Sequence, residues 1–224
     1  ALHRKTLNEF RKYMLVGGMP QAVEAFRNSS DFAKADTIKK QILSLYLADI
    51  GKYAGKDELK VYSLLGDIPG QLSKKEKKFK LADIDKNARM RTYEDAFVWL
   101  DKSMMINRCV NATDPNIGLS MSRDNTTQKC YMGDTGLLVT QTFRDNEYTD
   151  NLLYKSVLLD KLNVNEGMLM ENIVAQMLRC NGHHLFFYSR IDSANRSNNM
   201  EIDFLISDNK KISPVEVKSS AYRK

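Results

Sequence analysis

The chain has 224 residues, of which 42% are hydrophobic and 28% charged, and its formal net charge is +6. This is the composition of an ordinary globular protein with one substantial core or two small ones. No apolar run approaches the ~20 residues of a membrane-spanning helix, and the N-terminus lacks a signal-peptide pattern. We therefore expect a cytoplasmic protein without a membrane partner. The irregularly spaced Cys109, Cys130 and Cys180 argue against a zinc site and favour reduced thiols.

Residues 1–55 are predicted to be helical. One helix places Leu7, Phe10 and Met14 on a single face and ends at Gly17-Gly18, after which Pro20 is suited to open the next. A third helix is expected after the capping cluster Ser29-Ser30-Asp31.

Residues 56–125 have the element order of a winged helix. We expect a helix from Asp57 to Ile68 that Pro69-Gly70 break, a short helix or turn at 81–84, and a third helix over 91–103. The apolar stretch 105–110 then predicts a strand, which would be the wing. A winged helix can bind DNA or serve only for protein contact, and the pattern leaves the two alternatives equally open.

Most of the net charge lies between Gln71 and Arg91, where eight basic residues face three acidic ones and give a local charge of +5. Such a patch attracts phosphate backbones, although a solvated lysine loop explains the charge about as well. The residues that we expect to contact DNA are Lys74, Lys75, Lys77, Lys78, Arg89 and Arg91.

Residues 126–224 alternate strands and helices, so the chain as a whole is predicted to be of the α/β (α+β) class. We expect a strand over 129–133, a helix capped by Asp134, a helix from Met168 to Cys180, and a strand over 184–188. Glu171 lies on the apolar side of the 168–180 helix. A carboxylate there is costly unless it is paired, protonated or bound to a cation.

The most informative segment is a predicted hairpin of two strands, 200–206 and 213–219. A two-residue turn at Asn209-Lys210 would place Asp203 opposite Glu216, and Glu201 opposite Lys218. Two opposed carboxylates are unfavourable unless a cation lies between them, and Mg²⁺ is the obvious candidate.

Five segments together resemble one known family. They are 13–20 (YMLVGGMP), 91–96 (RTYEDA), 171–175 (ENIVA), 201–206 (EIDFLI) and 214–218 (PVEVK). They are similar to the domain of unknown function that follows the AAA-type ATPase module in many bacterial and archaeal ATP-binding proteins. The resemblance covers nearly the whole chain.

This resemblance implies a helical piece from the end of the ATPase module over 1–55, a winged helix over 56–125, and a restriction-endonuclease-like PD-(D/E)XK domain over 126–224. That last domain is expected to be truncated, because its following helix and strand are missing. Ile202 replaces the proline of the motif. The chain has no GxxxxGK[ST] motif, so ATP would bind only in a domain outside this segment.

The resemblance carries the nuclease-like signature onto four residues, Glu171, Asp203, Glu216 and Lys218. Asp203 and Glu216 would hold Mg²⁺, Lys218 would position water or steady the developing charge, and Glu171 would be an outer ligand. Two functions stay open: a DNA-binding, metal-dependent phosphodiesterase attached to the ATPase, or a non-catalytic module of that ATPase that binds DNA or protein.

Overall fold

The computed structural model describes residues 2–116, 118–144, 151, 154, 166–192, 194–208 and 211–218. Its helices are α1 (Leu2–Val16), α2 (Pro20–Ser29), α3 (Phe32–Tyr53), α4 (Glu58–Ser73), α5 (Met90–Lys102), α6 (Thr135–Thr142) and α8 (Glu166–Cys180). Its strands are β1 (Ile106–Ala112), β2 (Arg123–Met132), β3 (Leu185–Arg190), β4 (Met200–Asp208) and β5 (Lys211–Val215). Within the described ranges, no helix combines the length and apolarity needed to cross a membrane.

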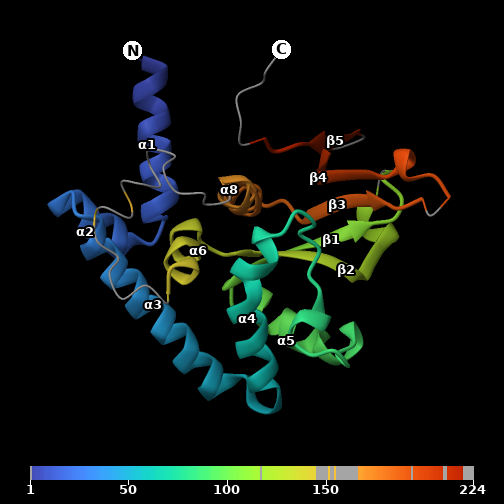
Figure 1. The fold of residues 1–224 in the computed structure, drawn as a ribbon, viewed down its shortest axis with the longest axis horizontal. Coiled ribbons are helices and arrows are strands. Elements are labelled where there is room, and N and C mark those ends of the chain that lie inside the picture. The colour runs from blue at the N-terminus through green and yellow to red at the C-terminus, as the bar shows by residue number, and fades with distance from the viewer. Residues whose placement is uncertain are drawn as a thin grey trace.

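The five strands form one mixed sheet in the order β2-β1-β3-β4-β5 (Figure 1). β1 pairs in parallel with β3, and the other neighbours are antiparallel. α8 packs against β1, β2 and β3, and α5 packs against β1. The predicted α+β class is confirmed, with helices first and the sheet towards the C-terminal end.

The sheet crosses the second predicted domain boundary, and the hydrophobic core crosses both. The boundary between 125 and 126 falls inside β2, and the strand predicted as a wing is β1, an inner strand of the sheet. Among the described residues, the larger of two hydrophobic clusters includes Met14 of α1, Leu65 of α4 and Phe204 of β4. All seven residues of β1 are buried, because neighbouring strands flank both of its edges and other elements cover its faces.

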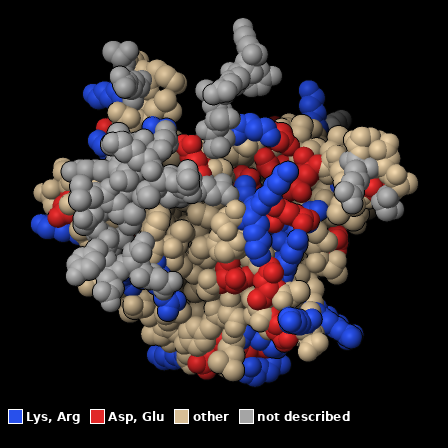
Figure 2. All heavy atoms as spheres, in the orientation of Figure 1, with Lys and Arg blue, Asp and Glu red and all other residues tan. Residues whose placement is uncertain are grey.

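Charged side chains of both signs gather on the side of the molecule where the sheet and the segment after α4 lie (Figure 2). Lysine and arginine side chains there lie directly beside aspartate and glutamate side chains. Much of the positive charge in this region is therefore compensated by its neighbours.

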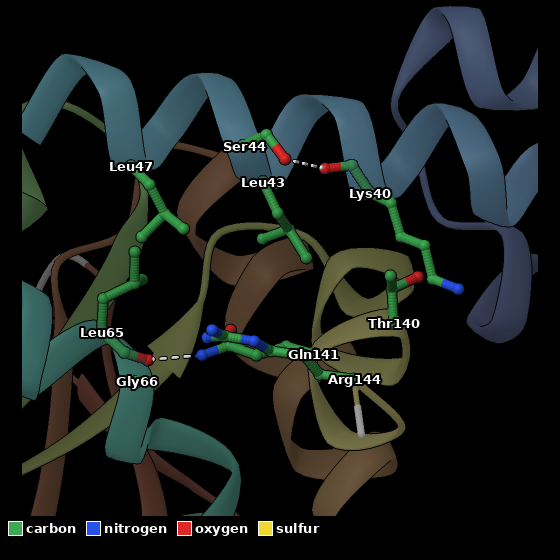
Figure 3. Close-up of a pocket in the computed structure, with 9 residues that line it drawn as sticks. All are labelled: Lys40, Leu43, Ser44, Leu47, Leu65, Gly66, Thr140, Gln141 and Arg144. Atoms are coloured by element: carbon green, nitrogen blue, oxygen red, sulfur yellow. Dashed lines mark hydrogen bonds between the residues drawn. The ribbon is translucent and has the colours of Figure 1, made fainter. Parts of the chain in front are cut away.

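Helix α4 continues through Pro69 to Ser73, so the predicted break at Pro69-Gly70 is wrong. A proline has no N–H group to donate to the carbonyl four residues earlier, which here is the Leu65 carbonyl. The side chain of Gln141 replaces that donor, because its Nε2 lies 2.6 Å from the Leu65 oxygen (Figure 3). A tertiary contact between α4 and α6 thus replaces the hydrogen bond that this proline removes.

The end of α1 and the start of α6 meet at Asp134. The predicted helix end is confirmed, since Gly17 has a φ of +82° and its N–H donates to the Tyr13 carbonyl at 2.8 Å. Asp134 caps α6 as expected, with Oδ1 accepting from the Leu137 N–H at 2.9 Å. Its other oxygen accepts from the Gly18 N–H at 2.6 Å, so one carboxylate joins the two helices.

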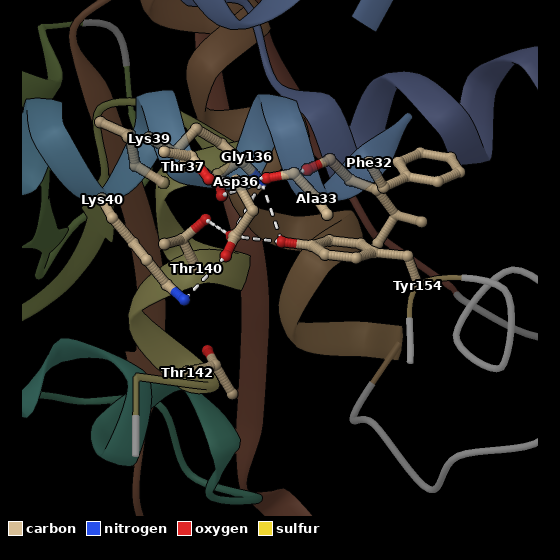
Figure 4. Close-up of polar contacts among 12 residues, drawn as sticks. Phe32, Ala33, Asp36, Thr37, Lys39, Lys40, Gly136, Thr140, Thr142 and Tyr154 are labelled. Carbon is tan, nitrogen blue, oxygen red and sulfur yellow. Dashed lines mark hydrogen bonds and ion pairs between the residues drawn. The ribbon is translucent and has the colours of Figure 1, made fainter. Parts of the chain in front are cut away.

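A buried polar network joins α3 to α6 (Figure 4). Asp36 accepts hydrogen bonds from Thr140, at 2.7 Å, and from the Tyr154 hydroxyl, and Lys40 lies 3.1 Å from its other oxygen. The Lys39 ammonium donates to the Leu15 carbonyl at 2.7 Å and to the Gly136 carbonyl at 3.3 Å. Burial, against the attraction of Asp36, lowers the pKa of Lys39 to about 8.

Two helical glycines give a matched test of this packing. A Cβ at Gly136 would meet the Val16 carbonyl oxygen and lie 2.6 Å from the Gly17 Cα, whereas a Cβ at Gly66 would meet nothing within 4 Å. We expect Gly136→Ala to lower the free energy of unfolding by about 1–3 kcal/mol. We expect Gly66→Ala to raise it by about 0.5–1 kcal/mol, through helix propensity alone. Urea denaturation measures both, and equal effects would contradict the close approach of α1 to α6.

Lys39 predicts a specific pH dependence of stability. Because the unfolded chain binds this proton more tightly than the folded protein does, the free energy of unfolding should rise as the pH increases from about 8 to about 10. The contribution of this group should be roughly 2 kcal/mol over that range. Lys39→Met should lack it, while Lys34→Met, which replaces an exposed lysine on the same helix, should keep it. Urea denaturation at each pH tests this, and parallel curves for wild type and Lys39→Met would refute it.

Candidate functional site

The centre of the candidate site is a buried lysine, Lys129 on β2. Its side chain is 1% exposed, and its ammonium lies 2.7 Å from Glu201 Oε1 and 3.6 Å from Asp203 Oδ1. Both carboxylates belong to β4, so the lysine reaches across two intervening strands. Its partner in the register on β1 is the small Cys109. The ammonium also lies 5.1 Å from the centre of the Phe187 ring.

A β-bulge in β4 directs Asp203 towards this lysine. Between the pairs Phe186↔Leu205 and Tyr188↔Ile202, β3 has one residue, Phe187, and β4 has two, Asp203 and Phe204. Simple alternation would direct Asp203 and Phe204 to opposite faces. Here Asp203 is near Lys129, and Phe204 lies 5.5 Å from the Tyr131 ring, two residues along β2 from Lys129. The bulge therefore places a carboxylate and a core aromatic ring on the same face.

Glu171 reaches the same face from α8. Its Oε2 accepts a hydrogen bond from the Tyr131 hydroxyl at 3.1 Å, its Oε1 pairs with Lys77, and its side chain is 8% exposed. Burial, then the charges of Cys109 and Glu171, raise the pKa of Tyr131 well above its ordinary value, so it keeps the proton that it donates. The expectation that a glutamate on the apolar side of this helix needs a partner is confirmed.

The carboxylates keep Lys129 charged. Burial by itself lowers the pKa of Lys129, but the charge and hydrogen bond of Glu201, followed by the charges of Glu171 and Asp203, raise it above its ordinary value. The face thus holds a buried ammonium that is surrounded by acidic residues from α8 and β4.

Strands β4 and β5 pair in the predicted register, with Asp208 opposite Lys211 and Phe204 opposite Val215. Continued by one residue, the same register would place Asp203 opposite Glu216. However, β5 ends at Val215, and the Val217 N–H donates to Asp203 Oδ2 at 2.9 Å.

Of the four residues of the nuclease-like signature, the structure brings Glu171 and Asp203 to one face but leaves the other two at the surface. Val215 and Val217 both pack against the core. Glu216 and Lys218 alternate with these valines, have side chains 44% and 71% exposed, and pair with each other at 3.0 Å. This hydrogen bond raises the pKa of Lys218.

The arrangement does not fit a Mg²⁺ ion held by Asp203 and Glu216. Both oxygens of Asp203 already face donors, which are the Lys129 ammonium and the Val217 N–H, and both oxygens of Glu171 are bound by Lys77 and Tyr131. Among the described residues, no group of three or more His, Cys, Asp or Glu side chains is arranged to hold a metal ion. The cation that compensates these carboxylates is an ammonium group.

The predicted DNA-binding residues divide into two sets. Lys74 pairs with Asp83 at 2.5 Å, Lys77 with Glu171, and Lys78 with Glu76 at 3.6 Å and Glu201 at 4.0 Å. The hydrogen bond from Lys74, followed by that from Gln71, lowers the pKa of Asp83. Three others, Lys75, Arg89 and Arg91, are exposed, as is Lys86. In the part of the chain that the structure describes, the side chains of these four cations have no ion pair or hydrogen bond.

The sequence analysis missed Lys129 and Tyr131, and it placed Glu201 opposite Lys218, whereas Glu201 pairs with Lys129. One signal was available. Lys129 begins the stretch Lys129–Met132, whose residues are otherwise apolar and which is fully buried. A lysine in such a strand requires an anionic partner, as the glutamate on α8 requires a cation.

Comparisons with known proteins give two family matches. Residues 166–224 match the family described as Domain of unknown function (DUF4143). No curated protein and no solved structure matches the chain. Residues 7–148, more than half of the chain, match a second family. The chain therefore belongs to the family described as Domain of unknown function (DUF8612).

Proposed function

We propose that this chain is a non-hydrolytic, nucleic-acid-binding module of an AAA-type ATPase. The observation that carries the proposal is the set of four exposed and unpaired cations between residues 75 and 91, which are Lys75, Lys86, Arg89 and Arg91. The other lysines of the 74–80 segment are paired with carboxylates, so these four are the ones available for phosphate groups.

The position of two of these cations favours a phosphate ligand. Arg89 is the N-cap residue of α5, and Arg91 lies in its first turn. The free N–H groups and the positive end of the dipole at a helix N-terminus attract anions, and two arginines beside it strengthen that attraction. Contacts of this kind hold a nucleic-acid backbone without reading its sequence.

Attachment to an ATPase rests on the resemblance of the motifs, and the C-terminal match fits it because that family is known from AAA-ATPase contexts. In the proposed arrangement, ATP is bound outside this segment, and α1 to α3 form the connection. One core joins these helices to the sheet. A force applied at the proposed nucleic-acid-binding surface would therefore be transmitted through packed side chains to α1 to α3, where the ATPase is proposed to be attached.

A second candidate is Mg²⁺-dependent phosphodiester hydrolysis. The observation in its favour is that two carboxylates and a lysine, Glu171, Asp203 and Lys129, reach one face from three separate elements. Against it, Lys77 covers Glu171, and Glu216 with Lys218 lies at the surface. Binding of the ion would require both of these segments to move.

The DNA-binding proposal predicts a salt-dependent affinity that depends on the free cations. With about four phosphate contacts, the plot of log affinity against log salt concentration should have a slope of about −3.6 for duplex DNA. Arg89→Ala/Arg91→Ala should reduce the magnitude of that slope by about 2 and weaken binding by roughly 10-fold or more at 100 mM salt. Fluorescence anisotropy with a labelled duplex measures both.

The matched control is Lys52→Ala/Lys56→Ala, which removes the same charge from exposed positions at the end of α3 and just beyond it. It should bind DNA almost as wild type does. If both double variants weaken binding equally, net charge alone drives association and the proposed surface is wrong.

The proposal that the chain does not hydrolyse phosphodiester bonds predicts how its stability responds to metal ions. With 10 mM Mg²⁺ or Mn²⁺, the melting temperatures of wild type and Asp203→Asn should shift by the same amount, because neither would hold an ion at the carboxylates. A rise that Asp203→Asn abolishes, together with plasmid cleavage that Glu216→Gln and Lys218→Ala abolish, would favour the hydrolase. DNA binding would still be measured separately, so the two functions are distinguishable.

A further inference from the structure

The contact that stabilises α4 around Pro69 leaves an unsatisfied acceptor on α6. The Leu65 carbonyl can only accept, so the Gln141 amide must present its Nε2 to it, at 2.6 Å. The orientation of the amide is therefore fixed, and Oε1 points elsewhere. Oε1 is buried and has no hydrogen-bond partner among the described residues. A buried acceptor without a partner is unusual, and a donor other than the described residues would satisfy it.

Gln141 lines a pocket of about 230 Å³ between α3, α4 and α6 (Figure 3). Its apolar walls come from Leu43 and Leu47 of α3 and Leu65 of α4, and hydroxyl groups come from Ser44 and Thr140. The pocket lies on helices that pack against one another and is separate from the carboxylate cluster and from the four free cations.

Gly66 leaves this pocket open on the α4 side. It lines the pocket, and a Cβ built on it would meet nothing within 4 Å. A glycine in the middle of a helix is unfavourable relative to alanine, and no close backbone approach requires it here. The glycine therefore leaves open space at this wall of the pocket.

The pocket also carries positive charge. Lys40 and Arg144 both line it. Lys40 is held 3.1 Å from Asp36, so it is already partly compensated. The Arg144 side chain is exposed and has no ion pair or hydrogen bond within the described part of the chain. Arg144 is therefore the cation that is available to a ligand.

We propose that this pocket binds a small organic anion that combines an apolar ring or chain with an N–H or O–H donor. The anionic group pairs with Arg144, the apolar part lies against Leu43, Leu47 and Leu65, and the donor satisfies Gln141 Oε1. Because Oε1 is closed to solvent in this structure, entry of the donor requires side chains at the pocket wall to shift, and the long, exposed Arg144 side chain can do so.

The test uses three probes of similar size in titration calorimetry with the whole chain. Indole-3-acetate has the anion, the ring and the N–H donor, 1-naphthaleneacetate lacks the donor, and indole-3-ethanol lacks the charge. We expect indole-3-acetate to bind with a dissociation constant on the order of 0.1–1 mM, which is typical for ligands of this size. The other two probes should bind at least about 5-fold more weakly.

Three variants connect the binding to this pocket. Gly66→Leu should fill the space while keeping the helix, since leucine is a strong helix former, and should weaken indole-3-acetate at least about 10-fold. Arg144→Ala, an exposed substitution without a partner to lose, should weaken it by about as much. Gly66→Ala is the control, because it makes the same backbone change with one methyl group and should leave binding within about 3-fold of wild type.

The results decide the proposal in either direction. Binding that Gly66→Leu and Arg144→Ala both weaken, with melting temperatures close to that of wild type, supports it. No binding of indole-3-acetate to wild type at 10 mM overturns it, as does equal binding to all the variants. Equal affinities for indole-3-acetate and 1-naphthaleneacetate would refute the role of Gln141.

Discussion

The ammonium of Lys129, buried between β2 and β4, is the interaction on which the arrangement of the C-terminal part depends. A charge without solvent is tolerable only when anions surround it, and Glu201 and Asp203 supply them from β4 while Glu171 approaches from α8. The bulge in β4, the position of α8 and the hydrogen bond from Tyr131 all direct acidic or polar groups to this face. Charge as well as backbone pairing thus links β2 to β4 across the two strands that lie between them.

Lysines occupy the positions where the sequence suggested a metal ion. Asp203 does face a cation, Lys129, but the predicted opposite carboxylate, Glu216, lies at the surface and pairs with Lys218 instead. Which cation serves depends on distant segments, since Lys129 comes from another strand and Lys77 from the connection after α4. Ion pairing also engages most lysines of the basic segment. Among the described residues of that segment, four exposed cations have no ion pair, and two of them, Arg89 and Arg91, lie at the start of α5.

In the N-terminal half, too, a polar group that lacks a local partner is compensated by a residue from a distant segment. Pro69 leaves the Leu65 carbonyl without its helical donor, Gln141 supplies one from α6, and its own oxygen is then left without a partner. Asp134 and Lys39 also link α1, α3 and α6 through buried polar groups. These contacts help to pack the N-terminal helices and the sheet around one hydrophobic cluster, which extends across the predicted boundaries at 55 and 125.

Local patterns determined much of the structure: the helix termini at Gly17 and Asp134, the hairpin register that sets Phe204 opposite Val215, and the buried side of Glu171. These depend on backbone geometry and side-chain period over a few residues, which the sequence contains directly. Tertiary structure alone decided that α4 continues through Pro69, that β1 is an inner strand, and that Lys129 lies among the carboxylates. Each of these depends on a partner tens of residues away, and neither periodicity nor spacing specifies which of several suitable partners will be adjacent in space.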